Sequence, residues 1–155
     1  MFNEIKQYLD SRNWNYQAIT QNGHRIFKMQ LNGINGSVSF IIDVCDETVL
    51  TMAICSVNTP PEKRTLMAEL LTRINFKMLL GNFDMDFEDG EVRFTLSWHY
   101  DPSAPVSQPV IDHNIMTCAA MLDRYLPAIM RINFSNAIPV TALQEVEGLP
   151  HFMFN

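Results

Sequence analysis

The densest set of groups that could do chemistry is a run of carboxylates between residues 84 and 91. Its members are Asp84, Asp86, Glu88, Asp89 and Glu91. A calcium-binding loop of this kind places glycine at its sixth position and a bidentate glutamate at its twelfth. Counted from Asp84, the glycine is seventh and the twelfth residue is Thr95, so the spacing does not fit calcium. The acidic residues instead alternate with Phe83, Met85 and Phe87, which predicts the wet face of a β-hairpin.

Histidine and cysteine, the other common catalytic and metal-binding residues, are scattered along the chain. They are His24, His99, His113, His151, Cys45, Cys55 and Cys118. No two histidines have the i, i+4 spacing of a helical zinc site, and the cysteines lack the close pairs of a zinc or disulfide framework. The sequence also contains no nucleophile elbow, phosphate loop or dinucleotide-binding glycine motif. We therefore expect no enzyme activity, no catalytic residues, no cofactor and no metal ion.

The composition is that of a folded, acidic protein. The 155 residues carry a net charge of −6, and 47% of them are apolar. This length suits a single domain spanning residues 1–155, whose core needs no disulfide or metal. Nucleic acids and anionic membranes attract clustered basic residues, whereas the densest basic pair here is Lys63–Arg64. We expect neither as a partner, and the lack of a signal peptide or membrane span predicts a cytoplasmic location.

Period-two alternation and turn residues predict the strands. They cover residues 16–21, 24–31, 38–44, 48–56, 83–87 and 92–100. Asn22–Gly23 and Asp89–Gly90 are tight-turn signals, so the strands beside them are expected to form hairpins. In strands 38–44 and 48–56 apolar residues occupy both faces, which is typical of central strands that are covered on both sides.

Apolar residues at three- and four-residue spacing predict helices before, between and after the strands. Residues 2–12 form a short amphipathic helix. Thr59 and Glu62 form a capping box, so a second helix is expected to begin at Pro60 and to end at Gly81. Strands that cluster between helices predict an α+β fold with a mostly antiparallel sheet flanked by helices.

Two more helices are expected in the last third of the chain. A long helix should begin near Ser107 and kink at Pro127, because proline removes one backbone donor. A second capping box, Thr141 to Gln144, predicts a last helix that stops at Gly148. Five methionines lie in or beside the long helices, and they either fill the core or line an adaptable groove. The apolar tail 151–155 either docks on its own domain or contacts a neighbouring subunit.

Several segments resemble the YbjN-like family of bacterial sensory-transduction regulators. They are Glu62-Lys63-Arg64, Arg73-Ile74-Asn75-Phe76, Gly81-Asn82-Phe83-Asp84-Met85-Asp86, Glu88-Asp89-Gly90-Glu91-Val92-Arg93-Phe94 and Ala120-Met121-Leu122-Asp123-Arg124-Tyr125-Leu126-Pro127-Ala128-Ile129. The order of elements agrees over residues 1–134. The resemblance implies a fold similar to type III secretion chaperones, usually dimeric, and it brings no catalytic residues to carry over.

These observations lead to two hypotheses about function. The first is a non-enzymatic regulatory or chaperone-like protein-binding module, a homodimer that binds an unidentified protein through residues still unknown. The alternative is a small-molecule sensor with an apolar pocket between the sheet and the long helix. For a dimer, the second helix and the outer sheet face around Trp98 are the first surfaces to consider.

Overall fold

A computed structural model describes residues 1–148, which form helices packed on an antiparallel sheet. The helices are α1 (Phe2–Ser11), α2 (Arg64–Asn75), α3 (Gln108–Phe134) and α4 (Pro139–Glu147), with a 3₁₀ turn, η1 (Pro61–Lys63), before α2. The strands are β1 (Tyr16–Gln21), β2 (His24–Asn32), β3 (Ser37–Cys45), β4 (Thr48–Cys55), β5 (Asn82–Met85) and β6 (Val92–His99). Their order across the sheet is β1-β2-β3-β4-β6-β5, and every neighbouring pair is antiparallel. The predicted α+β fold class is confirmed.

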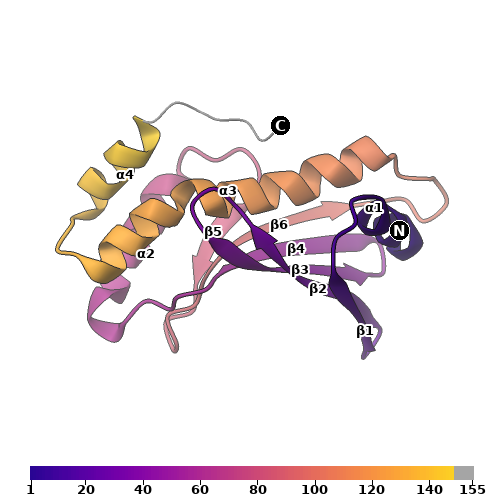
Figure 1. The fold of residues 1–155 in the computed structure, drawn as a ribbon, viewed down its shortest axis with the longest axis horizontal. Coiled ribbons are helices and arrows are strands. Elements are labelled where there is room, and N and C mark those ends of the chain that lie inside the picture. The colour runs from indigo at the N-terminus through magenta and orange to yellow at the C-terminus, as the bar shows by residue number, and fades with distance from the viewer. Residues whose placement is uncertain (149–155) are drawn as a thin grey trace.

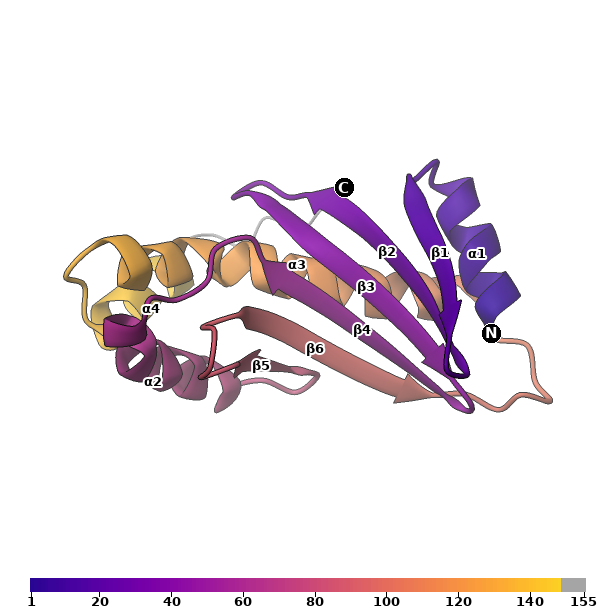
Figure 2. The ribbon, with the colours of Figure 1, turned by 90° about the horizontal axis from the view of Figure 1, so that it is seen from below.

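The long helix α3 lies across one face of the sheet, and no helix within residues 1–148 covers the opposite face, called the open face below (Figure 1 and Figure 2). Figure 1 shows α3 above the strands, with α1 near one of its ends and α2 and α4 near the other. Figure 2 looks at the opposite face, where the strands lie in front of α3. The largest fully buried side chains come from the sheet and its helices and include Phe27, Phe40, Phe94, Ile115 and Leu122. Burial of this apolar layer is the main force that holds α3 on the sheet.

The sequence pattern of β3 and β4 predicted burial of both faces, but the structure fully buries only one. Only alternate residues, such as Phe40 and Ile42, are fully buried under α3. Ile41 and Cys45 lie on the open face and are half-buried. The prediction that both faces of these strands are covered is therefore wrong for the part of the chain that the structure describes.

Trp98 lies on the helix side of the sheet, not on the outer face where we expected it. It stands directly opposite Val49 in the β4–β6 register, and directly opposed residues of antiparallel strands share a face. Val49 is fully buried in the core, and Trp98 packs against that core. The outer face must therefore be sought at the alternate positions of β6.

The predicted strands agree with β1 to β4 and with β6 to within one residue at each end. Strand β5 is shorter than predicted, because the chain leaves the sheet after Met85. There the amide of Asp86 donates to the carbonyl of Glu91 at 2.9 Å, and the amide of Gly90 donates to the carbonyl of Asp86 at 2.8 Å. Phe87, which we expected inside, lies in this loop and is 59% exposed.

The predicted start of the second helix is wrong. Residues 61–63 form η1, and the α-helix begins only at Arg64. Thr59 does not cap it: its hydroxyl is buried and has no hydrogen-bond partner among the described residues. The amide of Thr59 instead donates to the carbonyl of Gly90 at 2.7 Å. This contact with the β5–β6 loop holds the residue away from the helix.

The predicted end of the second helix is also wrong, because α2 stops at Asn75 rather than at Gly81. The Asn75 side chain forms hydrogen bonds with both the amide and the carbonyl of Phe83. Its Oδ1 accepts from the Phe83 amide at 2.7 Å, and its Nδ2 donates to the Phe83 carbonyl at 2.9 Å. One carboxamide thus joins the end of α2 to the start of β5 and turns residues 76–81 outward.

The remaining helices follow the sequence more closely. Helix α3 begins after Ser107, as predicted, and continues past Pro127 to Phe134; a kink at Pro127 stays a prediction. Helix α4 ends at Gly148, as predicted, but begins at Pro139, so the expected capping box at Thr141 is wrong. The tail 151–155 lies outside the described residues.

We expect Asn75→Ala to lower the free energy of unfolding by about 1–3 kcal/mol, because both backbone groups of Phe83 lose their partner. Asn58→Ala is the control, since Asn58 makes a single longer hydrogen bond, at 3.3 Å, to the carbonyl of Asp89. Urea unfolding measures both variants. Equal and small losses in the two variants would show that the Asn75 bridge does not hold the end of α2.

Candidate functional site

A buried carboxylate on α3 holds the turn between β2 and β3. The Asp123 side chain is 4% exposed and accepts the backbone amides of Ile34 at 3.1 Å and Asn35 at 2.8 Å. Gly33 passes so close that a Cβ there would lie 2.0 Å from Asp123 Oδ1. Amide donors make it possible to bury a charged group without a cation beside it.

Pro127 explains why this turn can also bind the backbone of Asp123. In an α-helix the carbonyl of residue 123 accepts the amide of residue 127, but proline has no amide hydrogen. The free carbonyl of Asp123 accepts from Asn35 Nδ2 at 2.9 Å instead. The side chain and main chain of Asp123 therefore both fix the β2–β3 turn against α3.

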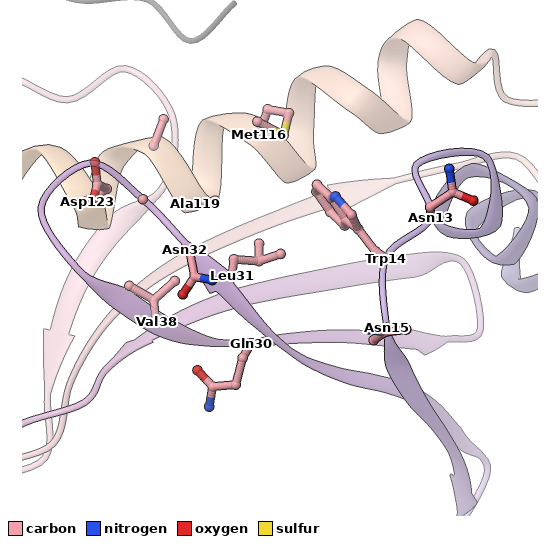
Figure 3. Close-up of a pocket in the computed structure, with 12 residues that line it drawn as sticks. Asn13, Trp14, Asn15, Gln30, Leu31, Asn32, Val38, Met116, Ala119 and Asp123 are labelled. Atoms are coloured by element: carbon pink, nitrogen blue, oxygen red, sulfur yellow. The ribbon is translucent and has the colours of Figure 1, made fainter.

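A cavity of about 320 Å³ opens beside this anchor, between α3, the ends of β2 and β3, and the α1–β1 connection. Figure 3 shows its lining, with Trp14 near one end and Asp123 near the other. The α3 side consists of Met116, Ala119, Ala120 and Asp123, which is the i, i+3, i+4, i+7 face of a helix. Two alanines in succession leave room that larger side chains would fill.

The α1–β1 connection carries Trp14 into the cavity. Asn13 adopts a left-handed φ of 54°, which asparagine tolerates better than most residues. The Trp14 ring packs edge-on against Tyr8 with 6.1 Å between centroids, and Tyr8 donates to Asp112 Oδ1 on α3 at 2.7 Å. Burial and this hydrogen bond raise the pKa of Tyr8 above its ordinary value. The hydroxyl therefore stays a donor and holds the wall of the cavity in place.

The cavity is lined by apolar side chains and by neutral amides. Leu31, Val38 and Met116 supply apolar surface beside Trp14, whereas Asn13 and Asn15 of the α1–β1 connection add carboxamides. The side chains of Gln30 and Asn32 bond to Ser39 and Ser37 on the other face of the sheet. Among residues 1–148, no lysine, arginine or histidine lines it. Its single charged group, Asp123, already accepts two backbone amides. Such a lining suits an uncharged molecule better than an anion, which would need a cation or several free donors.

The residues that could have done chemistry do not converge. The described residues contain no group of three or more His, Cys, Asp or Glu side chains placed to hold a metal. His24 contacts Asp43 at 2.8 Å, His99 contacts Thr48 at 3.1 Å, and both lie on the open sheet face. His151 lies outside the described range.

The cysteines are poor nucleophiles for a physical reason. Burial raises the pKa of Cys118 to about 12 and raises that of Cys55 as well. Desolvation and the nearby carboxylates of Asp46 and Asp43 raise the pKa of Cys45. Because the thiolate is the reactive species, none of these thiols is prepared for covalent chemistry at neutral pH.

Comparison with known proteins identifies the family of the chain. Residues 2–131 match the family YbjN, described as "Putative bacterial sensory transduction regulator". The chain belongs to the YbjN family. That description is of a regulator. No curated protein matches the chain, and no helix within residues 1–148 is long and apolar enough to cross a membrane.

Two solved structures share the fold at low identity. "YbjN, a putative transcription regulator from E. coli" has a TM-score of 0.56 and 14% identity, over 79% of this chain and 86% of that one. An uncharacterized protein from Methanothermobacter thermautotrophicus has a TM-score of 0.54 and 16% identity, over 80% of this chain and 94% of that one. The likeness to type III secretion chaperones is not tested by these comparisons and stays a prediction.

The YbjN-like segments of the sequence meet in the fold at the contacts described above. Asn75 and Phe83 come from two of these segments, and Asp123 and Pro127 come from a third. Sequence reasoning missed Asp123 as an anchor and Trp14 as a cavity residue. The only local signal was an acidic residue four positions before a proline inside an apolar helix.

We expect Asp123→Ala to lower the free energy of unfolding by about 2–4 kcal/mol, since the amides of Ile34 and Asn35 lose a charged acceptor. Asp123→Asn keeps one acceptor oxygen and should lose about half as much. Chemical denaturation measures the stabilities, and hydrogen exchange should show faster exchange at the amides of residues 34 and 35. Unchanged exchange at both amides in Asp123→Ala would contradict the anchoring role.

Proposed function

We propose that this YbjN-family chain is a non-enzymatic regulatory protein that senses a small uncharged molecule in the cavity beneath α3. The observation that carries the proposal is the cavity itself, whose lining combines the indole of Trp14, the thioether of Met116 and two alanines with the neutral amides of Asn13 and Asn15. Scattered histidines and high-pKa thiols support binding rather than catalysis. The family description as a regulator supports the same interpretation.

The lining narrows the kind of molecule. Trp14 and Met116 favour a flat, polarisable ring, because indole stacks on rings and the methionine sulfur makes favourable aromatic contacts. The carboxamides of Asn13 and Asn15 can donate to and accept from such a ring at its edge. Phosphorylated or carboxylated compounds find no cation among the described residues of the lining. The ligand class that fits is therefore an uncharged nitrogen heterocycle with hydrogen-bonding groups on its edge.

Ligand binding here would join three parts of the chain that are far apart in sequence. The cavity touches the α1–β1 connection, the β2–β3 turn and the centre of α3. A molecule that contacts all three binds more tightly when they are close together than when they are apart. Binding therefore shifts the population toward the close arrangement. This is how occupancy can be passed to the rest of the protein without a chemical step.

The test is a thermal-shift screen of uncharged heteroaromatic compounds against the wild-type chain and Ala120→Leu. We expect compounds that raise the melting temperature of the wild type, and at least a tenfold loss of affinity in Ala120→Leu, because leucine fills the cavity. Ala68→Leu on α2 is the matched control, since Ala68 does not line the cavity, and it should bind like the wild type. The proposal fails if no compound stabilises the wild type, or if Ala120→Leu binds equally well.

A protein-binding module is the second candidate, and one observation favours it. The connection between α2 and β5 exposes Phe76 at 90%, Leu79 at 98% and Leu80 at 54%. Large apolar side chains this exposed and this close in sequence are a feature of surfaces that bind other proteins. Lys77, between them, forms an ion pair with Glu147 of α4 at 2.8 Å. This ion pair links the α2–β5 connection to α4.

To test this candidate, the wild type and a Phe76→Ser/Leu79→Ser variant are used as baits in the same cell extract. We expect a protein that the wild type retains and the variant loses. Because both side chains are solvent-exposed, the variant should keep the wild-type circular dichroism spectrum. Recovery of identical proteins by both baits would rule out residues 76–80 as the binding surface.

A further inference from the structure

The open face of the sheet carries apolar residues in its centre. Counting alternate positions, the outward residues of β3 and β4 include Ile41, Leu50, Met52 and Ile54, and all are half-buried. Ile41 stands directly opposite Met52, so the four residues form one cluster across two strands. Ile19 and Ile26, also opposed, extend it onto β1 and β2. A sheet face meant for water normally carries polar residues at such positions.

The same face is electrically neutral, although the chain is not. Its outward strand positions hold two cations, Lys28 and Arg93, and two carboxylates, Asp43 and Asp84. The whole chain has a net charge of −6, so the excess acid lies elsewhere. Between two copies, contact through the acidic surfaces would be repulsive, whereas this face brings no net charge to the contact. A basic protein or a nucleic acid would find no field of opposite sign on it.

The size of the face is sufficient for a modest dimer. The five gaps of ~4.8 Å between six strands, and eight residues at ~3.3 Å rise, give a flat area of roughly 600 Å² per copy. Stable interfaces bury about 800 Å² per partner, and the lower limit for specific contacts is about 600 Å². Two sheets can pack face to face in this way, with their strand directions about 30° apart.

We propose that a second copy of this chain covers the open sheet face, with Ile41 and Met52 at the centre of the interface. This explains why β3 and β4 carry apolar residues on both faces. One face is buried by α3, and the other would be buried by the second copy. The inference is independent of the cavity beneath α3, which opens on the helix side of the sheet. It leaves Phe76, Leu79 and Leu80 free.

The test measures the mass of the full-length chain by light scattering after size-exclusion chromatography, over a hundredfold range of concentration. We expect twice the 17.8 kDa of one chain for the wild type. Met52→Glu and, separately, Ile41→Lys should shift the protein to the monomer mass and raise the dissociation constant at least a hundredfold. Two variants of opposite charge guard against an effect of charge sign, and circular dichroism checks that each is folded.

Leu79→Glu is the matched control, because it places the same charge at an exposed apolar residue remote from the sheet face, and it should remain a dimer. A monomeric wild type at every concentration overturns the inference. So does a dimer that survives both Met52→Glu and Ile41→Lys. A dimer that only Leu79→Glu breaks would also overturn it and would place the interface at residues 76–80.

Discussion

The structure depends on a buried carboxylate, Asp123, that forms no ion pair within the described part of the chain. Asp123 is buried under the β2–β3 turn and takes two backbone amides, while its own carbonyl, left without a helical donor by Pro127, takes the side chain of Asn35. Removing the turn's donors would leave the buried Asp123 carboxylate without partners, which costs more free energy than the loss of an ordinary exposed hydrogen bond. This anchor sets how far the ends of β2 and β3 lie from α3. The height of the neighbouring cavity follows from it.

The two sides of the sheet then serve different purposes. On the helix side, Ala119 and Ala120 leave space between the anchor and Trp14, and the neutral lining favours uncharged molecules. On the open side, the neutral apolar centre suits contact with an equally acidic copy of the chain. Both surfaces share β2 and β3, so a ligand that tightens the turn between these strands acts on the same elements that would form a dimer. Because β2 and β3 belong to both surfaces, binding at the cavity could change association at the open face.

Local signals in the sequence predicted most of the fold, and non-local contacts account for what they missed. Asn22–Gly23 and the alternation around it place β1 and β2 almost to the residue, because a hairpin is decided by its own neighbours. The predicted limits of α2 were wrong because the amide of Thr59 and the side chain of Asn75 bond to the β5–β6 hairpin, which no pattern within the helix reveals. Asp123 and its turn are 88 residues apart, and Trp14 meets Met116 across a similar separation. The residue pattern of a single segment does not reveal contacts between residues so far apart in the sequence.

The two tryptophans can show whether the cavity beneath α3 binds a ligand. Trp14 borders the cavity, whereas Trp98 packs against the core on β6, so their indole N–H signals in a ¹H–¹⁵N spectrum report separately. When a stabilising heteroaromatic compound is titrated in, the account predicts that the Trp14 signal shifts in a saturable manner while the Trp98 signal stays in place. A compound that binds but moves only Trp98, or neither signal, would contradict it.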